Sequence, residues 1–387
     1  MCIDARRGRR DTVSSTRESG ADGQKFDLLE AAEFVLSSQR RVNRVLKGFV
    51  ASGNIPSSLI FAGPEGVGKS LGAVGFASWL FCGRGAERNA EHTACGKVAS
   101  LEHPDLHLIY PVPYGDWEKS LAAAIESRRE DFFDDTSLGG RARSIGIDMV
   151  RHIIELTSKQ PYEGRHNVVI LFEAHTLTVE AQNAFLKLLE EPPSSALFIL
   201  VTEFPDKLLP TILSRCQTVR FDYPQDEVTK RFLERFFSVD PEEAERLSVL
   251  TQGNIERAVQ SIGGGLSKIA ATSGRLLKLA AGGDEAGILQ AAEKTAFGCS
   301  RDEVREILDE MVVLVRFILR RGSLGLSGIE RKVVAESMGE GTAKRLEAMG
   351  PAELVMRISK AKESIAANAD VELTIAQLLL DLAGKWC

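Results

Sequence analysis

The sequence has no long hydrophobic run. No stretch approaches the about 20 consecutive apolar residues that a membrane-spanning helix requires. The opening segment MCIDARRGRRDTVSSTRESGADGQ contains arginines but no apolar segment behind them, so it lacks the pattern of a secretory signal. We therefore expect no membrane partner, and we interpret residues 1–24 as a disordered tail.

Paired cysteines and an excess of positive charge are also missing. The six cysteines, at positions 2, 82, 95, 216, 299 and 387, form no paired framework, which favours a reducing, cytoplasmic environment. The formal net charge of −6 argues against a protein that coats DNA by itself, because non-specific DNA affinity comes from neutralising phosphates. Aromatic residues make up only 6%, but 44% apolar and 26% charged residues exclude a largely disordered chain.

Short apolar runs alternate with helical patterns in the first part of the 387-residue chain, a length that predicts two or three domains. The runs SSLIFAG, NVVILF and ALFILVT are typical of strands in a parallel sheet covered on both faces. Helical patterns separate them, such as IDMVRHIIELTSKQ and the TVEAQNAFLKLLEE that Pro192 and Pro193 end. This alternation predicts an α/β domain with a parallel sheet over residues 25–223. Residues 113–143 are a charged insertion in it, expected to be helical and exposed, to which we assign no role.

No convincing strand follows Pro224. Short helices are expected over residues 224–266, and longer ones over residues 267–387. In the second region one helical stripe is formed by Val304, Ile307, Leu308, Met311 and Leu314. The sequence thus predicts one α/β domain followed by two all-helical domains.

The segment GPEGVGKS has the pattern G-x-x-x-x-G-K-[ST] of a phosphate-binding loop. It consists of Gly63, Pro64, Glu65, Gly66, Val67, Gly68, Lys69 and Ser70. Because a predicted strand precedes it and a predicted helix follows, a chance match is disfavoured. Such a loop turns backbone N–H groups toward a β-phosphate at the positive end of the next helix. Lys69 is expected to reach the β- and γ-phosphates of ATP, and Ser70 to ligate Mg²⁺.

The strand VVILF lacks the residue that such a site needs beside the metal. P-loop ATPases end this strand with an aspartate that holds Mg²⁺, and a neighbouring glutamate orients the attacking water. Here Glu173 occupies the second position, but Phe172 occupies the first and cannot ligate a cation. Glu173 could turn toward the metal, but it would then leave the water unpositioned. Phe172 is also compatible with plain packing in the core. We expect ATP hydrolysis at this site to be weak or absent.

Taken together, several motifs make the chain resemble the bacterial clamp-loader subunits of DNA polymerase III, which belong to the AAA+ superfamily. The resemblance covers about residues 30–265 strongly and rests above all on NAFLKLLEEPP and on the SRC triplet at 214–216. It implies that the helices of 224–266 form a lid domain and that those of 267–387 form a collar for oligomerisation. It also implies partners: gamma/tau and delta subunits in a heteropentamer, a sliding clamp, and primer-template DNA.

The resemblance assigns roles to three further residues. Arg215 corresponds to the arginine finger that reaches across a subunit interface to ATP bound by the next subunit, and a guanidinium suits that task. The alternative is a surface arginine in an ordinary salt bridge. Thr202 corresponds to the sensor 1 position near the γ-phosphate, and Glu173 to a degenerate Walker B glutamate.

Two departures from the family pattern separate its branches. The delta-prime branch commonly loses parts of its own site but keeps SRC, whereas the gamma/tau motors keep the metal aspartate. Phe172 therefore favours delta-prime, as does Glu256, which stands where active members have an arginine, with Arg257 displaced by about 100° around the helix. An active gamma/tau-like motor remains the alternative. A P-loop enzyme of unrelated metabolism, such as a nucleotide kinase, is improbable because of the long LEEPP and SRC match.

The family usually carries a small four-cysteine zinc module before the HPD motif. Here Cys82 and Cys95 match two of its cysteines and His92 a third, while Asn89 occupies the fourth place. Tetrahedral zinc requires four N or S donors, so Zn²⁺ binding and a relic held by ordinary packing both remain open.

Overall fold

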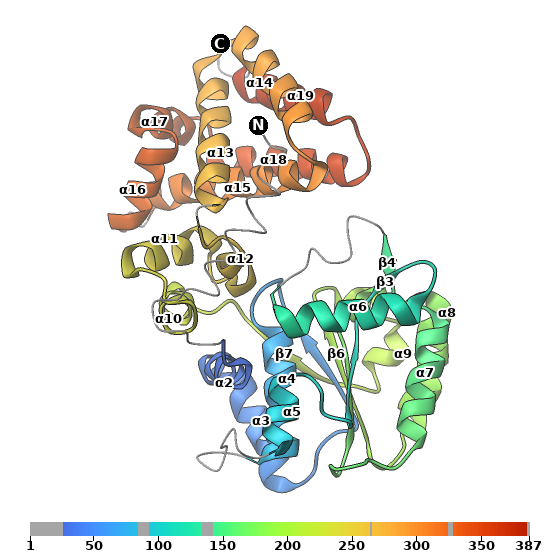
Figure 1. The fold of residues 1–387 in the computed structure, drawn as a ribbon. Coiled ribbons are helices and arrows are strands. Elements are labelled where there is room, and N and C mark those ends of the chain that lie inside the picture. The colour runs from blue at the N-terminus through green and yellow to red at the C-terminus, as the bar shows by residue number, and fades with distance from the viewer. Residues whose placement is uncertain (1–25, 84–92, 134–141, 264, 324–327, 385–387) are drawn as a thin grey trace. The chain divides into compact units, whose positions relative to one another are not determined.

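The computed structural model describes residues 26–83, 93–133, 142–263, 265–323 and 328–384. These residues divide into two compact units (Figure 1). The first unit lies within 25–238 and 252–260, and the second within 239–251 and 261–387. Helices occur on both sides of residue 239, where the chain passes from the first unit to the second. The predicted domain boundaries at 224 and 267 remain a prediction.

A five-stranded parallel sheet forms the centre of the first unit. Its order is β2-β5-β6-β1-β7, and every pairing within it is parallel. The strands are β2 (Leu106–Ile109), β5 (Asn167–Leu171), β6 (Ala196–Thr202), β1 (Ser58–Ala62) and β7 (Gln217–Arg220). All residues of β1, β5 and β6 are buried, as their continuous apolar sequences predict for a sheet covered on both faces. The predicted α/β class is confirmed.

Helices cover both faces of this sheet. Figure 1 shows α4 and α5 on one side and α7 and α8 on the other. Around the sheet, the first unit has the helices and short 3₁₀ turns α2 (Leu28–Ser38), α3 (Arg40–Ser52), α4 (Lys69–Cys82), α5 (Thr93–Ala99), α7 (Ile147–Ser158), η1 (Ala174–Thr176), α8 (Val179–Glu190), η2 (Pro205–Lys207) and α9 (Pro210–Leu213).

Two helices precede the phosphate loop, α2 and α3, and the single residue Gln39 separates them. Gln39 has a ψ of 72°, which ends α2 and starts α3. Its side chain explains the break: Nε2 donates to the carbonyl of Asp222 at 2.6 Å, and Oε1 accepts from the Asp222 N–H at 3.3 Å. A buried amide that satisfies the backbone beyond β7 therefore outweighs one more helical turn.

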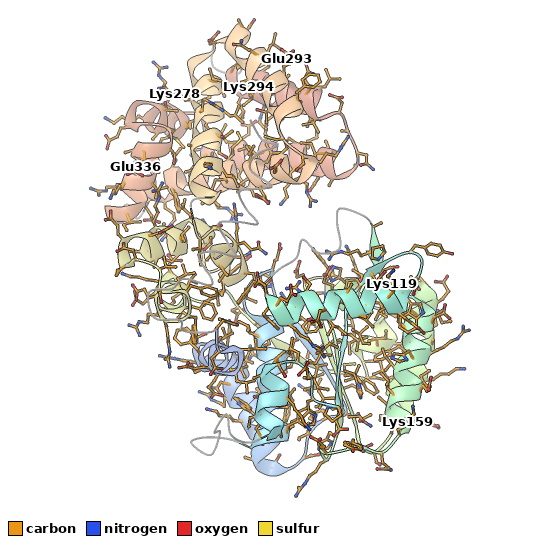
Figure 2. All side chains as sticks on the ribbon, in the orientation of Figure 1. Lys119, Lys159, Lys278, Glu293, Lys294 and Glu336 are labelled. Carbon is orange, nitrogen blue, oxygen red and sulfur yellow. The ribbon has the colours of Figure 1, made fainter. Side chains whose placement is uncertain are left out.

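The charged insertion contains the helix that the sequence predicts. Strands β3 (Val112–Pro113) and β4 (Arg143–Ser144) pair antiparallel, and α6 (Trp117–Glu130) lies between them in the chain. Asp116 caps α6 by accepting from the Lys119 N–H at 3.2 Å. Lys119 itself is exposed on this helix (Figure 2). The insertion is not exposed throughout, because Phe132 and Phe133 at its far end are only 7% and 4% exposed.

An aromatic cluster fastens a further helix to this unit. Phe133 stacks edge-on against Phe26, Phe232 and Phe237, at centroid distances of 5.7, 6.3 and 5.9 Å. Phe232 and Phe237 belong to α10 (Asp226–Phe237), which also forms an ion pair from Arg235 to Glu30 of α2. The end of the insertion thus packs against both the start of the α/β unit and α10.

The second unit is helical throughout its described residues. It contains α11 (Pro241–Thr251), α13 (Gly265–Gly282), α14 (Glu285–Gly298), α15 (Arg301–Ser323), α16 (Gly328–Ser337), α17 (Glu340–Ala348), α18 (Pro351–Ala366) and α19 (Val371–Gly384). The predicted stripe of α15 is confirmed, since none of its five residues is more than 4% exposed. Charged residues such as Lys278, Glu293 and Lys294 lie on outer helix faces (Figure 2). No described helix has the length and apolarity needed to cross a membrane.

Candidate nucleotide site and arginine finger

The phosphate loop connects β1 to α4, as the motif requires. Gly66 and Gly68 have φ angles of 68° and 86°, a conformation that favours glycine, and Gly68 directly precedes α4. Lys69 is only 5% exposed, and its Nζ donates to the Pro64 carbonyl at the start of the same loop. The structure therefore brings Gly63 to Ser70 into the strand–loop–helix geometry of a phosphate cradle.

A second segment closes onto this loop within the same unit. The Ile255 N–H, at the start of α12 (Ile255–Gln260), donates to the Gly66 carbonyl at 2.8 Å. The Asn254 side chain lies against Gly66 so closely that a Cβ there would overlap it. Asn254 also caps α12 by accepting from the Arg257 N–H at 2.8 Å. This contact brings Glu256, the residue at the expected arginine position, close enough to Lys69 to influence its charge.

Lys69 lies among acidic groups. Burial lowers its pKa, and Glu203, Glu256 and Glu65 act in the opposite direction by stabilising its charge. Sequence reasoning missed Glu203, which follows Thr202 at the carboxyl end of the central strand β6. That position is its signal, because in a parallel sheet such residues gather at the ligand-binding edge. Burial is the main cause that raises the pKa of Glu203 to about 7, and repulsion from Glu65 adds to it.

We expect this carboxyl to make ATP binding depend on pH. Glu203 is mostly ionised at pH 8 and mostly protonated at pH 6, so raising the pH adds a negative charge near the phosphates. Equilibrium titration of the full chain with a fluorescent ATP analogue is expected to give tighter binding by Glu203→Gln at pH 8, by about three- to tenfold. The two proteins should converge at pH 6. The matched control Glu118→Gln changes an exposed side chain of α6 and should give the same pH profile as the wild type. Identical pH profiles for wild type and Glu203→Gln would contradict this assignment.

Phe172 packs in the core. It is 4% exposed, and its ring stacks on Tyr110 with centroids 4.3 Å apart and planes 2° apart. The two residues follow the neighbouring strands β5 and β2, so they meet at the same sheet edge. The Arg128 guanidinium of α6 lies over the Tyr110 ring, 5.6 Å from its centroid. The place of a metal-binding aspartate is therefore filled by a phenylalanine ring, which provides no ligand.

Glu173 takes an unusual backbone conformation, with a φ of 47°. Its carboxylate lies 3.8 Å from the Arg143 guanidinium of β4, so the insertion places a cation beside Glu173. Thr202 is 1% exposed at the end of β6. Its hydroxyl accepts from the Phe204 N–H at 3.1 Å and lies 3.3 Å from Nδ1 of His175. Burial, with nearby Lys207 and Lys69, lowers the pKa of His175 to about 4, which keeps this imidazole neutral.

Arg215 follows α9 on the surface of the α/β unit. Its Nη1 donates to the Thr211 carbonyl at 3.1 Å, and its Nη2 to Oε1 of Glu190 at 2.9 Å. The side chain is 36% exposed. Beside it, burial raises the pKa of the half-buried Cys216 thiol to about 12, which keeps it protonated at neutral pH. Sequence reasoning missed Glu190 as the partner of Arg215, because the two are far apart in the chain.

The structure describes two of the three possible zinc ligands. Cys82 is half-buried and Cys95 is buried, whereas His92 lies outside the described residues. In the ranges that the structure describes, no group of three or more His, Cys, Asp or Glu side chains is placed to hold a metal ion. On the Mg²⁺ side Ser70 is present at the start of α4, but Phe172 supplies no oxygen.

Comparison with known proteins relates part of this chain to subunits of DNA polymerase III. Residues 38–225 match the family model described as DNA polymerase III, delta subunit. The DNA polymerase III subunit delta′ of Bacillus subtilis is 30% identical over 224 residues, which cover 57% of this chain and 58% of that protein. The tau subunit of the same organism is 30% identical over 185 residues, covering 48% of this chain and 28% of tau.

More distant similarity extends beyond these subunits. The replication factor C small subunit of Methanosarcina acetivorans is 30% identical over 224 residues, 56% of this chain and 52% of that protein. A gamma-subunit-related protein from Thermotoga maritima, of known structure, is 16% identical with a TM-score of 0.42, covering 89% of this chain and 99% of that one. The chain spans little more than half the length of the first curated relatives it matches, 58% and 51%. Over residues 38–225, this chain is similar to the clamp-loader subunits of DNA polymerase III.

Proposed function

We propose that this chain is a delta-prime subunit of a clamp loader, which helps to load a sliding clamp onto primed DNA. It does so in a heteropentamer with gamma/tau and delta subunits, to which it contributes Arg215 rather than ATP hydrolysis. The observation that carries the proposal is a contrast within one unit. The metal-side position is filled by the buried stack of Phe172 on Tyr110, whereas Arg215 remains accessible.

The phosphate loop keeps the groups that bind a nucleotide. Backbone N–H groups at the start of α4 and the Lys69 ammonium suit the phosphates of ATP, and the Ser70 hydroxyl suits Mg²⁺. ATP would supply a γ-phosphate here, but Phe172 leaves the metal without its aspartate and Glu173 is paired with Arg143. Binding without turnover is the expected behaviour of this site.

The test compares the two halves of the proposal in one assembly. The clamp loader of the same organism is reconstituted with clamp and primed DNA, and steady-state ATP turnover is measured with wild-type chain, Lys69→Ala or Arg215→Ala. Lys69→Ala should leave turnover unchanged, because this chain's own site does not hydrolyse ATP. Arg215→Ala should lower it. If Lys69→Ala removes a share of the turnover instead, the chain is a gamma/tau-like motor.

A further inference from the structure

The Arg215 guanidinium is held at two of its nitrogens. Thr211 accepts from Nη1 through its backbone carbonyl, and Glu190 accepts from Nη2 through a carboxylate oxygen. A guanidinium has five N–H donors in a fixed fork, so these two contacts set its plane and leave donors for phosphate oxygens. We propose that Glu190 is the positioning residue of the arginine finger, an inference that rests on the proposed function of Arg215.

The location of Glu190 indicates a functional reason for its negative charge. Glu190 is the last residue of α8, followed by Glu191 and then by the prolines that end the helix. Carboxylates at a helix C-terminus are unfavourable, because the helix dipole places partial negative charge there. Residues that break a local rule often belong to functional sites. Arg215 supplies the compensating cation, at 2.9 Å from Glu190.

Hydrogen bonds of a buried glutamine hold the scaffold under this ion pair. Gln182 of α8 is 4% exposed, and its Oε1 accepts from the Leu209 N–H at 2.7 Å. Its Nε2 donates to the carbonyls of Leu177 and Lys207, at 3.2 and 3.3 Å. These bonds fix the start of α9 against α8, and so fix the two ends of the Glu190–Arg215 pair. Because exposed ion pairs add little to stability, the main consequence of this pair is the orientation of the guanidinium.

The experiment uses the reconstituted clamp loader with clamp and primed DNA, and measures by rapid quench the single-turnover rate at the site that Arg215 contacts, together with KM for ATP. Glu190→Ala is expected to lower this rate by about three- to tenfold with KM changed less than about twofold, because an arginine that is not oriented loses contacts made in the transition state. Glu190→Gln keeps an acceptor without the charge and should lie between wild type and Glu190→Ala. The adjacent Glu191→Ala is the matched control and should behave as wild type.

A second background separates positioning from structure. In an Arg215→Ala assembly, Glu190→Ala should have no further effect, since the group through which it acts is gone. An unchanged single-turnover rate for Glu190→Ala, or an added loss in the Arg215→Ala background, would overturn the inference while the finger stands. If Arg215→Ala itself leaves turnover unchanged, the proposed function fails, and this inference fails with it.

Discussion

Replacement of Arg215 by alanine is expected to slow ATP hydrolysis at the neighbouring site that we propose it contacts by about 10³-fold, the lower end of the range for arginine fingers. The reason is electrostatic: charge develops on the transferring phosphoryl group, and a fixed guanidinium stabilises it without reorganisation. Total turnover of the assembly should fall by the share which that site contributes. Rapid-quench measurement of a single turnover resolves the site itself.

Two variants make this result specific. Arg215→Lys keeps the charge but loses the planar fork, so it should recover only a small part of the rate. Arg151→Ala removes another exposed arginine of the same unit, one that pairs with Asp148 at 2.8 Å on α7, and should leave turnover unchanged. Full activity for Arg215→Ala would mean that Arg215 is only a surface residue in a salt bridge with Glu190.

Replacement of Asp105 by alanine is expected to lower the free energy of unfolding by about 3–5 kcal/mol. Asp105, in the HPD motif, is 2% exposed and accepts three backbone N–H groups, from Tyr162 at 2.5 Å, Glu163 at 2.8 Å and Gly164 at 2.6 Å. Alanine would leave these donors without their acceptor. Asp105→Asn keeps one acceptor and should cost about 2 kcal/mol. Urea denaturation at pH 7, followed by tryptophan fluorescence, measures both changes.

The contribution of Asp105 to the free energy of unfolding should depend on pH. Burial alone would raise the pKa of Asp105, but the three N–H donors outweigh it and hold the pKa below its usual value. Its contribution is therefore complete above the pKa of the unfolded chain, about 4, and is lost as the pH falls through the lower folded pKa. The stability difference between wild type and Asp105→Asn should narrow below pH 4. Asp116→Ala, which removes only an exposed helix cap, should cost about 0.5–1 kcal/mol. If Asp105→Ala also lowers the free energy of unfolding by only about 0.5–1 kcal/mol, the three hydrogen bonds to Asp105 do not stabilise the fold.

Local pattern was sufficient for the sheet, the phosphate loop and the helical second unit. Continuous apolar runs predict buried parallel strands because both faces must be covered, and GPEGVGKS predicts its own backbone shape through its glycines. The α15 stripe follows from helical periodicity alone. The substitution of phenylalanine at position 172 was likewise visible in the sequence, together with its consequence for metal binding.

The tertiary structure decided which distant residues meet. Gln39 breaks a continuous helical pattern because its partner, Asp222, lies beyond the last strand. Glu203 approaches Lys69, Tyr110 stacks on Phe172, and Glu190 pairs with Arg215 only because the strand order brings the ends of separate elements to one edge or places α8 beside α9. Such pairs leave no periodic signal along the chain. The sequence by itself therefore determined the type of site, whereas the fold determined the charges that surround it.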